Sequence, residues 1–140
     1  TRSQNAVLVN GEGQIPHSVN STAKIVQERF TPTYDYVAGD ATPAYGKKLE
    51  RAVRHAVFVK GPAPFIVLYD ELIAPQPAKF QFMLHALSAF SIEETTARLR
   101  VSQPKSGLDV RYLSPVPLTF GQTDGYVPKP TKEFPNQWHV

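Results

Sequence analysis

Proline and glycine occur so often along this chain that long helices are disfavoured. Its 140 residues include 13 Pro and 8 Gly. A proline inside a helix removes a hydrogen bond and clashes with the preceding turn, and a glycine there carries an entropic cost. The runs between these residues are short and alternate apolar with polar side chains, which is the period of a β-strand. We therefore predict an all-β fold, an antiparallel β-sandwich with little helix.

Alternating runs and short, fully apolar runs define the expected strands. They lie at residues 6–9, 24–30, 34–38, 49–60, 65–69, 79–87, 95–101 and 108–113. Residues 49–60 also fit helical spacing, but their β-branched density and the Gly61-Pro62 stop favour a strand. The sequence from Ser91 to Glu94 is typical of a capping box, which predicts one helical turn at most.

The length predicts a single domain over residues 1–140. Five prolines from Ser114 onward predict that residues 114–140 form an irregular tail. The sequence begins Thr-Arg-Ser, without an initiator Met and without the basic, apolar and small-residue order of a signal peptide. We therefore expect the chain to be part of a longer protein.

Charge and cysteine content narrow the classes of function. The chain has 15 Lys and Arg against 12 Asp and Glu, for a net charge of +3. This excess is small for a protein that binds nucleic acid, so we expect no nucleic-acid partner. The densest basic cluster, residues 47–54, fits a solvated surface or a patch for an acidic ligand. The absence of cysteine excludes disulfides, thiolate zinc sites and cysteine nucleophiles. No apolar run approaches the roughly 20 residues of a membrane-spanning helix.

The four histidines do not have the spacing of a zinc motif on a helix. Neighbouring strands could still bring His55 and His85 together, with Asp40 or Asp70 as a third ligand. Histidines held singly by hydrogen bonds on a strand face are the favoured interpretation. The sequence therefore predicts no metal and no cofactor.

Other catalytic patterns are weak. The adjacent carboxylates Asp70-Glu71 and Glu93-Glu94 could suggest acid/base chemistry, but neighbours on a strand point to opposite faces. Exposed turn residues are the favoured interpretation of both pairs. Aromatic residues of the expected strands, such as Tyr36, Tyr69 and Phe80, fall on alternating faces, where the core is their expected place.

Binding of a sugar is the remaining class that the residues allow. Amides, aromatic rings and arginines on sheets and loops bind sugars, and anionic sugars favour Arg and Lys. The candidates on this criterion are Gln4, Asn10, Gln14, Tyr45, Arg51 and Arg54.

Several stretches together resemble the β-domain of the heparinase II/III-like polysaccharide lyases. Residues 4–14 read QNAVLVNGEGQ, where that family commonly has His-Asn-x-Val-Leu-Val-Asp/Asn-Gly-x-Gly-Gln. The similarity continues through VAGDAT at 37–42, RHAVFVK at 54–60 with FIVLYDEL at 65–72, and FQFMLH at 80–85. It covers about residues 4–87, and residues 88–140 are similar only in being β-like.

The resemblance implies a secreted or periplasmic bacterial enzyme that cleaves uronate-containing polysaccharides, such as glycosaminoglycans, by β-elimination. The family's fold is an (α/α) toroid followed by antiparallel β-sheets, so this chain would be half of a supersandwich-like β-domain. The catalytic groups of the family lie upstream, and no catalytic residue can be carried onto this chain. Family members with a structural zinc take one ligand from a His whose position here is Gln4, so the resemblance implies no zinc.

The leading hypothesis is a non-catalytic module that packs against its N-terminal toroid and forms one wall of a cleft for an acidic polysaccharide. A stand-alone carbohydrate-binding module and a structural or oligomerisation domain are the alternatives, and a homodimer is left open. The predicted substrate-binding residues are Gln4, Asn5, Asn10, Gln14, Arg51 and Arg54.

Overall fold

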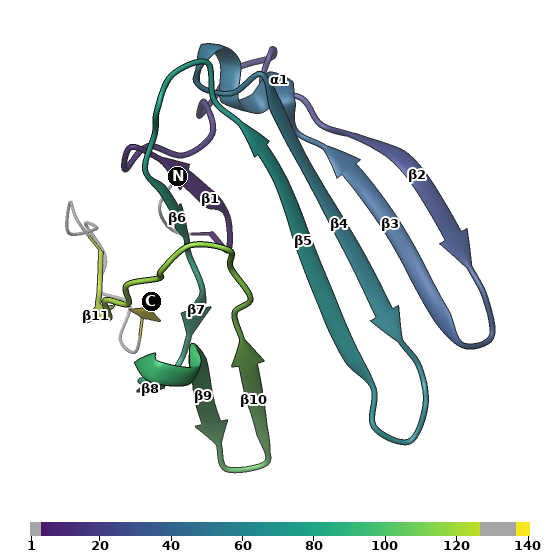
Figure 1. Ribbon diagram of the computed structural model, residues 1–140, viewed down its shortest axis with the longest axis vertical. Helices are drawn as coiled ribbons and strands as arrows, with labels where there is room; N and C mark the ends of the chain where they lie inside the picture. The colour runs from purple at the N-terminus through teal and green to yellow at the C-terminus, as the bar shows by residue number, and fades with distance from the viewer. Residues whose placement is uncertain (1–3, 127–136) are drawn as a thin grey trace. The chain divides into compact units, whose positions relative to one another are not determined.

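The computed structural model describes residues 4–126 and 137–140. It consists of antiparallel β-sheets with one helix of four residues and two short 3-10 turns in the described part (Figure 1). The prediction of an all-β, antiparallel, sandwich-like fold with little helix is confirmed. The chain divides into two compact units, which are described separately below. The first holds residues 8–80, and the second holds residues 81–140 with the segment before residue 8.

The first half of the chain contributes the longer strands. Its elements are β1 (Val7–Val9), β2 (Lys24–Phe30), β3 (Tyr34–Asp40), α1 (Thr42–Tyr45), the 3-10 turn η1 (Gly46–Lys48), β4 (Arg51–Val59) and β5 (Phe65–Ile73). The strands β2, β3, β4 and β5 form one four-stranded antiparallel sheet in that order. Short hairpin loops join β2 to β3 and β4 to β5, whereas the segment that holds α1 and η1 joins β3 to β4. The ambiguous residues 49–60 are thus a strand, as their β-branched content predicted.

The register of this sheet gives it two distinct faces, because directly opposed residues point the same way. His55 lies opposite Ala38 and Tyr69, and Phe58 lies opposite Asp35 and Ile66. The His55 face carries Gln27, Arg29, Tyr34, Tyr36, Arg51, Val53, His55, Val57, Phe65, Val67, Tyr69 and Glu71. The Phe58 face carries Phe30, Asp35, Val37, Ala52, Arg54, Ala56, Phe58, Ile66, Leu68, Asp70 and Leu72.

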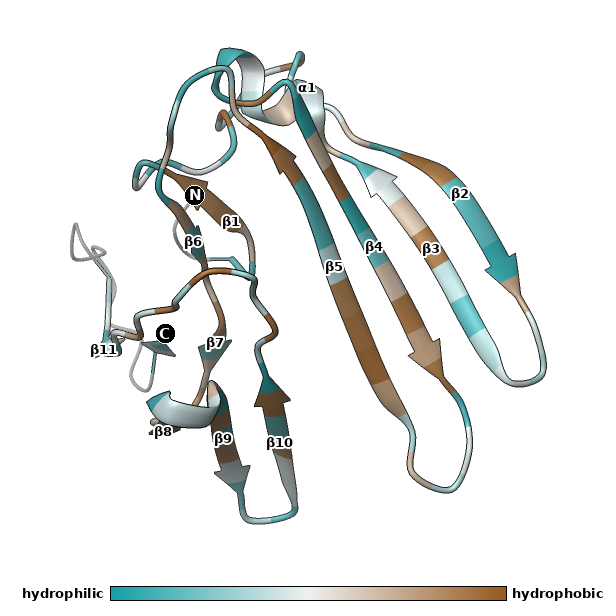
Figure 2. Cartoon of the chain, viewed as in Figure 1, coloured by the Kyte–Doolittle hydropathy of each residue, from teal (hydrophilic) through white to brown (hydrophobic). Residues whose placement is uncertain are grey.

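The core of the first unit lies at the α1 end of the sheet. Buried side chains of Val9, Tyr45, Leu49 and Ala52 pack together there, with Leu72 against them. The hairpin end is much more open, and the apolar stretch of β5 shows there beside the end of β4 (Figure 2). Within the first unit, the buried apolar cluster thus lies at the α1 end of the sheet.

The short helix α1 was not predicted, and the corner that holds it is built from polar contacts. Oδ1 of Asp40 accepts a hydrogen bond from the Thr42 amide at 2.9 Å, and Oγ1 of Thr42 accepts one from the Ala52 amide at 2.9 Å. Gly46 ends the helix with φ of 58°, where a Cβ would lie 2.8 Å from Cδ1 of Ile15. Glycine suits this position for both reasons.

The second half of the chain has shorter strands. Its elements are β6 (Phe80–Phe82), β7 (His85–Ala86), β8 (Ser91–Glu93), the 3-10 turn η2 (Glu94–Thr96), β9 (Arg98–Gln103), β10 (Ser106–Arg111), β11 (Thr123–Asp124) and β12 (Trp138–His139). The sheets have the orders β8-β9-β10, β7-β12-β11 and β1-β6. The single strand expected over 79–87 is therefore two strands. The turn expected within 91–94 comes three residues later, after a short strand.

Aromatic packing supports the second unit. The Tyr112 ring contacts those of Phe82 and Phe120, with centroids 5.7 and 5.8 Å apart, and Leu99 is almost completely buried. Burial raises the pKa of Tyr112 to about 12, because a phenolate loses hydration there. Much of the expected tail, residues 127–136, lies outside the described residues. Within the described ranges, no helix is long and apolar enough to cross a membrane.

Candidate functional site

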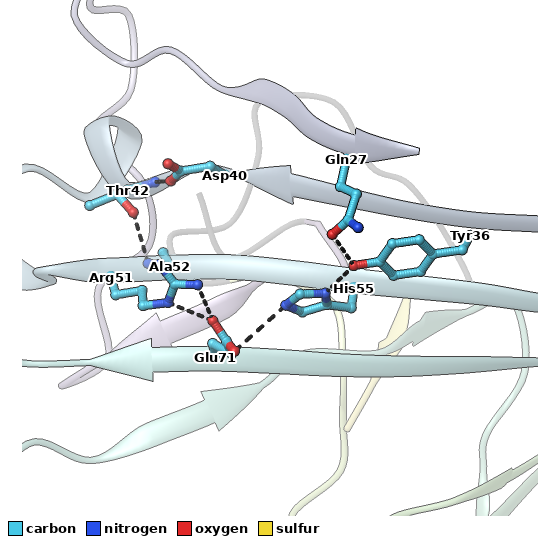
Figure 3. A network of polar contacts seen from close by, with 8 residues as sticks. All are labelled: Gln27, Tyr36, Asp40, Thr42, Arg51, Ala52, His55 and Glu71. Atoms are coloured by element: carbon cyan, nitrogen blue, oxygen red, sulfur yellow. Dashed lines mark hydrogen bonds and ion pairs between the residues drawn. The ribbon is translucent and has the colours of Figure 1, made fainter. Parts of the chain in front are cut away.

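The His55 face carries a polar network with at least one side chain from each strand of the four-stranded sheet and two from β4 (Figure 3). The Tyr36 hydroxyl lies 2.8 Å from Nδ1 of His55 and donates to Oε1 of Gln27 at 3.2 Å. On the other side of the imidazole, Nε2 lies 3.8 Å from Oε1 of Glu71. The Arg51 guanidinium pairs with the same carboxylate. We call these five residues the His55 network.

Ring contacts extend the His55 network along the sheet. The Tyr36 and His55 rings stack with centroids 6.0 Å apart, and the Tyr69 ring lies 5.6 Å from His55 on the other side. The Arg29 guanidinium lies 6.0 Å from the centre of the Tyr34 ring. Tyr69 is 60% exposed. The expectation that the strand aromatics fill a core is therefore wrong for Tyr69, and it is also wrong for Phe80, which is 42% exposed.

His55 has two different environments at its two ring nitrogens. Nδ1 is hydrogen-bonded to Tyr36, while Nε2 is buried and has no hydrogen-bond partner. The contact with Glu71 is too long for a hydrogen bond and acts as an ion pair only when the imidazole is protonated. The interpretation of His55 as a singly held histidine on a strand face agrees with this geometry.

The two predicted arginines do not form a common site. Arg51 lies on the His55 face, whereas Arg54 lies on the Phe58 face with Nε 2.7 Å and Nη2 2.9 Å from the Asp70 carboxylate. This bidentate hydrogen bonding raises the pKa of Arg54, against the burial that lowers it. Residues three apart on a strand point to opposite faces, so one ligand on a single face cannot contact both.

Two of the four predicted amide residues, Asn5 and Asn10, hold the backbone in place. Oδ1 of Asn5 accepts hydrogen bonds from the His85 amide at 2.9 Å and contacts its Nδ1 at 3.1 Å. Oδ1 of Asn10 accepts from the Lys79 amide at 2.9 Å, and Asn10 has a positive φ of 52°. Gln4 is exposed and Gln14 is half-buried. Gln4 and Asn5 belong to the second unit and the other four predicted residues to the first.

The paired carboxylates are not turn residues in the case of Asp70 and Glu71. Both lie within β5 and point to opposite faces, each toward its arginine. The apolar strand expected over 65–69 is present, but β5 runs four residues further than predicted and carries both carboxylates into the sheet. Glu93 lies in β8 and accepts a hydrogen bond from Thr96.

Much of the basic cluster at residues 47–54 is neutralised by acidic partners. Nζ of Lys48 lies 3.0 Å from Glu12 and also donates to the Gly13 carbonyl. His55 and His85 fall in different units. In the part of the chain that the structure describes, no group of three or more His, Asp or Glu lies close enough to hold a metal ion.

Sequence reasoning missed Gln27, Tyr36, Tyr69 and Glu71 as partners of His55. Their spacing along the chain carries no motif, and only the hairpin registers bring them to one face. The available signal was the position of Tyr34, Tyr36 and His55 at alternate places in two adjacent expected strands. Comparison of the chain with protein-family models found no match, and comparison with curated proteins found none.

Proposed function

We propose that this chain is a non-catalytic β-module of a heparinase II/III-like polysaccharide lyase that acts outside the bacterial cytoplasm. In this proposal the catalytic groups belong to an N-terminal toroid, and the β-module contributes one wall of the cleft. The similarity of residues 4–14 and 54–72 to the family supports it, as does the all-β fold. The substrate class is an acidic, uronate-containing polysaccharide.

The His55 face is the surface that we propose for the polysaccharide. The observation that carries this proposal is the row of rings from Tyr36 through His55 to the exposed Tyr69, with Arg51 beside it. A flat aromatic ring packs against the C–H groups of a sugar ring. A guanidinium has five N–H donors, so the pairing of Arg51 with Glu71 leaves donors for a carboxylate or sulfate of the ligand.

The His55 network also holds two rings of this face in a fixed orientation before a ligand binds. The Tyr36 and His55 rings are held by hydrogen bonds within the protein, so little side-chain freedom is lost when a ligand binds. Of the six residues predicted from the sequence, Arg51 is the one that lies on this face. Asn5 and Asn10 act in the proposal by fixing the chain around β1.

Calorimetry with oligosaccharides of heparan sulfate, alginate and hyaluronan tests the proposal. We expect micromolar binding that weakens with salt and falls about tenfold in Arg51→Ala and in Tyr69→Ala. Tyr69→Phe should bind like the wild type, because it keeps the ring. Arg100→Ala is the matched control, because Arg100 is an exposed, ion-paired arginine on β9.

Absence of binding to all three polysaccharides, or binding that neither Arg51→Ala nor Tyr69→Ala weakens, would contradict the use of this face. Formation of unsaturated uronate by the 140-residue chain alone would contradict the non-catalytic role. The alternative, a stand-alone carbohydrate-binding module, predicts the same binding but a native gene product near 15.6 kDa. The lyase module predicts a native product several times larger, and an immunoblot of the source cells distinguishes the two.

A further inference from the structure

The outer strand β5 leaves an apolar edge without a partner strand among the described residues. β5 is at one end of the sheet order, so alternate N–H and C=O groups point away from β4 and have no partner in this sheet. We call Phe65–Tyr69 the β5 edge segment. The residues of this segment are exposed on both faces of the sheet. From Phe65 to Tyr69, their exposed fractions are 55, 65, 46, 49 and 60%.

This edge lacks the features that usually protect an outer strand. Natural edges carry charged residues, proline or a bulge that prevent pairing with another chain. The β5 edge segment contains five apolar residues and none of these. The opposite edge, β2, has them, because its register is interrupted between Ile25 and Gln27 and it carries Lys24, Glu28 and Arg29.

The β5 edge segment is also close to a palindrome in its side-chain types. Read in either direction it runs aromatic, aliphatic, Val, aliphatic, aromatic. If two copies pair antiparallel with Val67 opposite Val67, each Phe65 lies opposite Tyr69 and each Ile66 opposite Leu68. These pairs match in size and lie on the same face, and aromatic and branched cross-strand pairs are the stabilising ones.

We propose that two copies of this chain associate through the β5 edge segment, antiparallel and with a two-fold axis at Val67, to form one continuous eight-stranded sheet. The contact is isologous, so each copy offers and receives the same surface. Edge-to-edge pairing covers the backbone edge and only part of these side chains, an area at the low end for specific association. A dimer with a dissociation constant in the micromolar range is therefore expected.

Sedimentation of the full 140-residue chain over about 1 to 200 μM tests the association. We expect the mass to rise from 15.6 kDa to twice that value. Val67→Lys should abolish the rise, because two like charges would meet at the axis. Val67→Glu should do the same, and an equimolar mixture of the two variants should restore the dimer. Val26→Lys is the matched control, since Val26 is 49% exposed on the protected edge.

Single cysteines test the register, because the natural chain has no thiol. Val67→Cys should form a disulfide dimer on mild oxidation, as directly opposed Cα atoms are about 4.5–5.5 Å apart. Phe65→Cys alone should not, because its copies would be about 14 Å apart. A mixture of Phe65→Cys and Tyr69→Cys should cross-link. Any of three results would overturn the proposal. The wild-type chain could stay at 15.6 kDa at every concentration, or Val67→Lys could dimerise like the wild type. Phe65→Cys alone could also cross-link as well as Val67→Cys does.

Discussion

The Tyr36 hydroxyl and the His55 imidazole are hydrogen-bonded at 2.8 Å across two adjacent strands, and their rings stack at an interplanar angle of 17°. The two residues do not lie directly opposite each other, because Tyr36 faces Val57 and His55 faces Ala38. They meet on the diagonal of the sheet, where aromatic side chains are long enough to reach. The small, buried Ala38 leaves room for this diagonal contact.

Replacement of Tyr36 by Phe should lower the free energy of unfolding by about 0.5–1.5 kcal/mol. The variant loses the contacts of the hydroxyl with both His55 and Gln27. Urea unfolding measures the change, and Tyr34→Phe is the control from the same strand and the same face. A Tyr36→Phe variant as stable as the control would show that these hydrogen bonds do not contribute to folding.

Because the two arginines point to opposite faces, their replacement by Ala should have separable effects. Arg54→Ala leaves the Asp70 carboxylate, whose side chain is only 18% exposed, without its bidentate partner, and should destabilise the fold by about 1–3 kcal/mol. Binding of the acidic oligosaccharides should change little. Arg51→Ala should weaken binding with a smaller effect on stability, because its ion pair is more exposed. Calorimetry and urea unfolding of both variants give the comparison, and equal losses of binding would contradict the two-face description.

Asp40 should make the fold weaker in acid. Hydrogen bonds from the Thr42 side chain and amide lower the pKa of Asp40 below its usual value of 3.8. The Asp40 carboxyl group therefore binds a proton less tightly in the folded state than in the unfolded state. The resulting stability is present above pH 3.8 and is lost as the pH falls through the lower folded value. In a plot of the urea-unfolding midpoint against pH, Asp40→Asn should make the fall at acidic pH less steep. An unchanged fall would exclude Asp40 as a contributor to the acid sensitivity of stability.

Tyr112 should ionise late in an alkaline titration. Burial raises its pKa to about 12, so the folded state favours the neutral phenol. Its contribution to stability is complete below the unfolded pKa, about 10, and is lost as the pH rises through about 12. Ultraviolet absorbance of tyrosinate measures this, and Tyr112→Phe should remove one late step from the titration. If that variant loses an early step instead, the described packing around Tyr112 is incorrect.

The sequence predicts the strands of the first unit better than the surfaces they form. Residues 24–30 were predicted to the residue, because polar residues at 20–22 and Thr31-Pro32 bound an alternating run. The helix α1 was missed because four residues carry no helical period, and its contacts come from Ala52, ten positions away from Thr42. The His55 network was missed because its members are chosen by hairpin register, which sequence spacing alone does not give.

The break in register of β2 limits how far an assembly of these sheets can grow. If both edge strands of a sheet can pair with another copy, copies keep adding and the product is a fibril. Here the bulge and the charges leave one edge unsuited to pairing, and the other edge is used up when a second copy binds to it. In the dimer proposed above, the stoichiometry would therefore stop at two, and an exposed apolar strand would be compatible with a product of defined size. Removal of both the register break and the charges of β2 would take away that stop and convert a finite complex into one that polymerises.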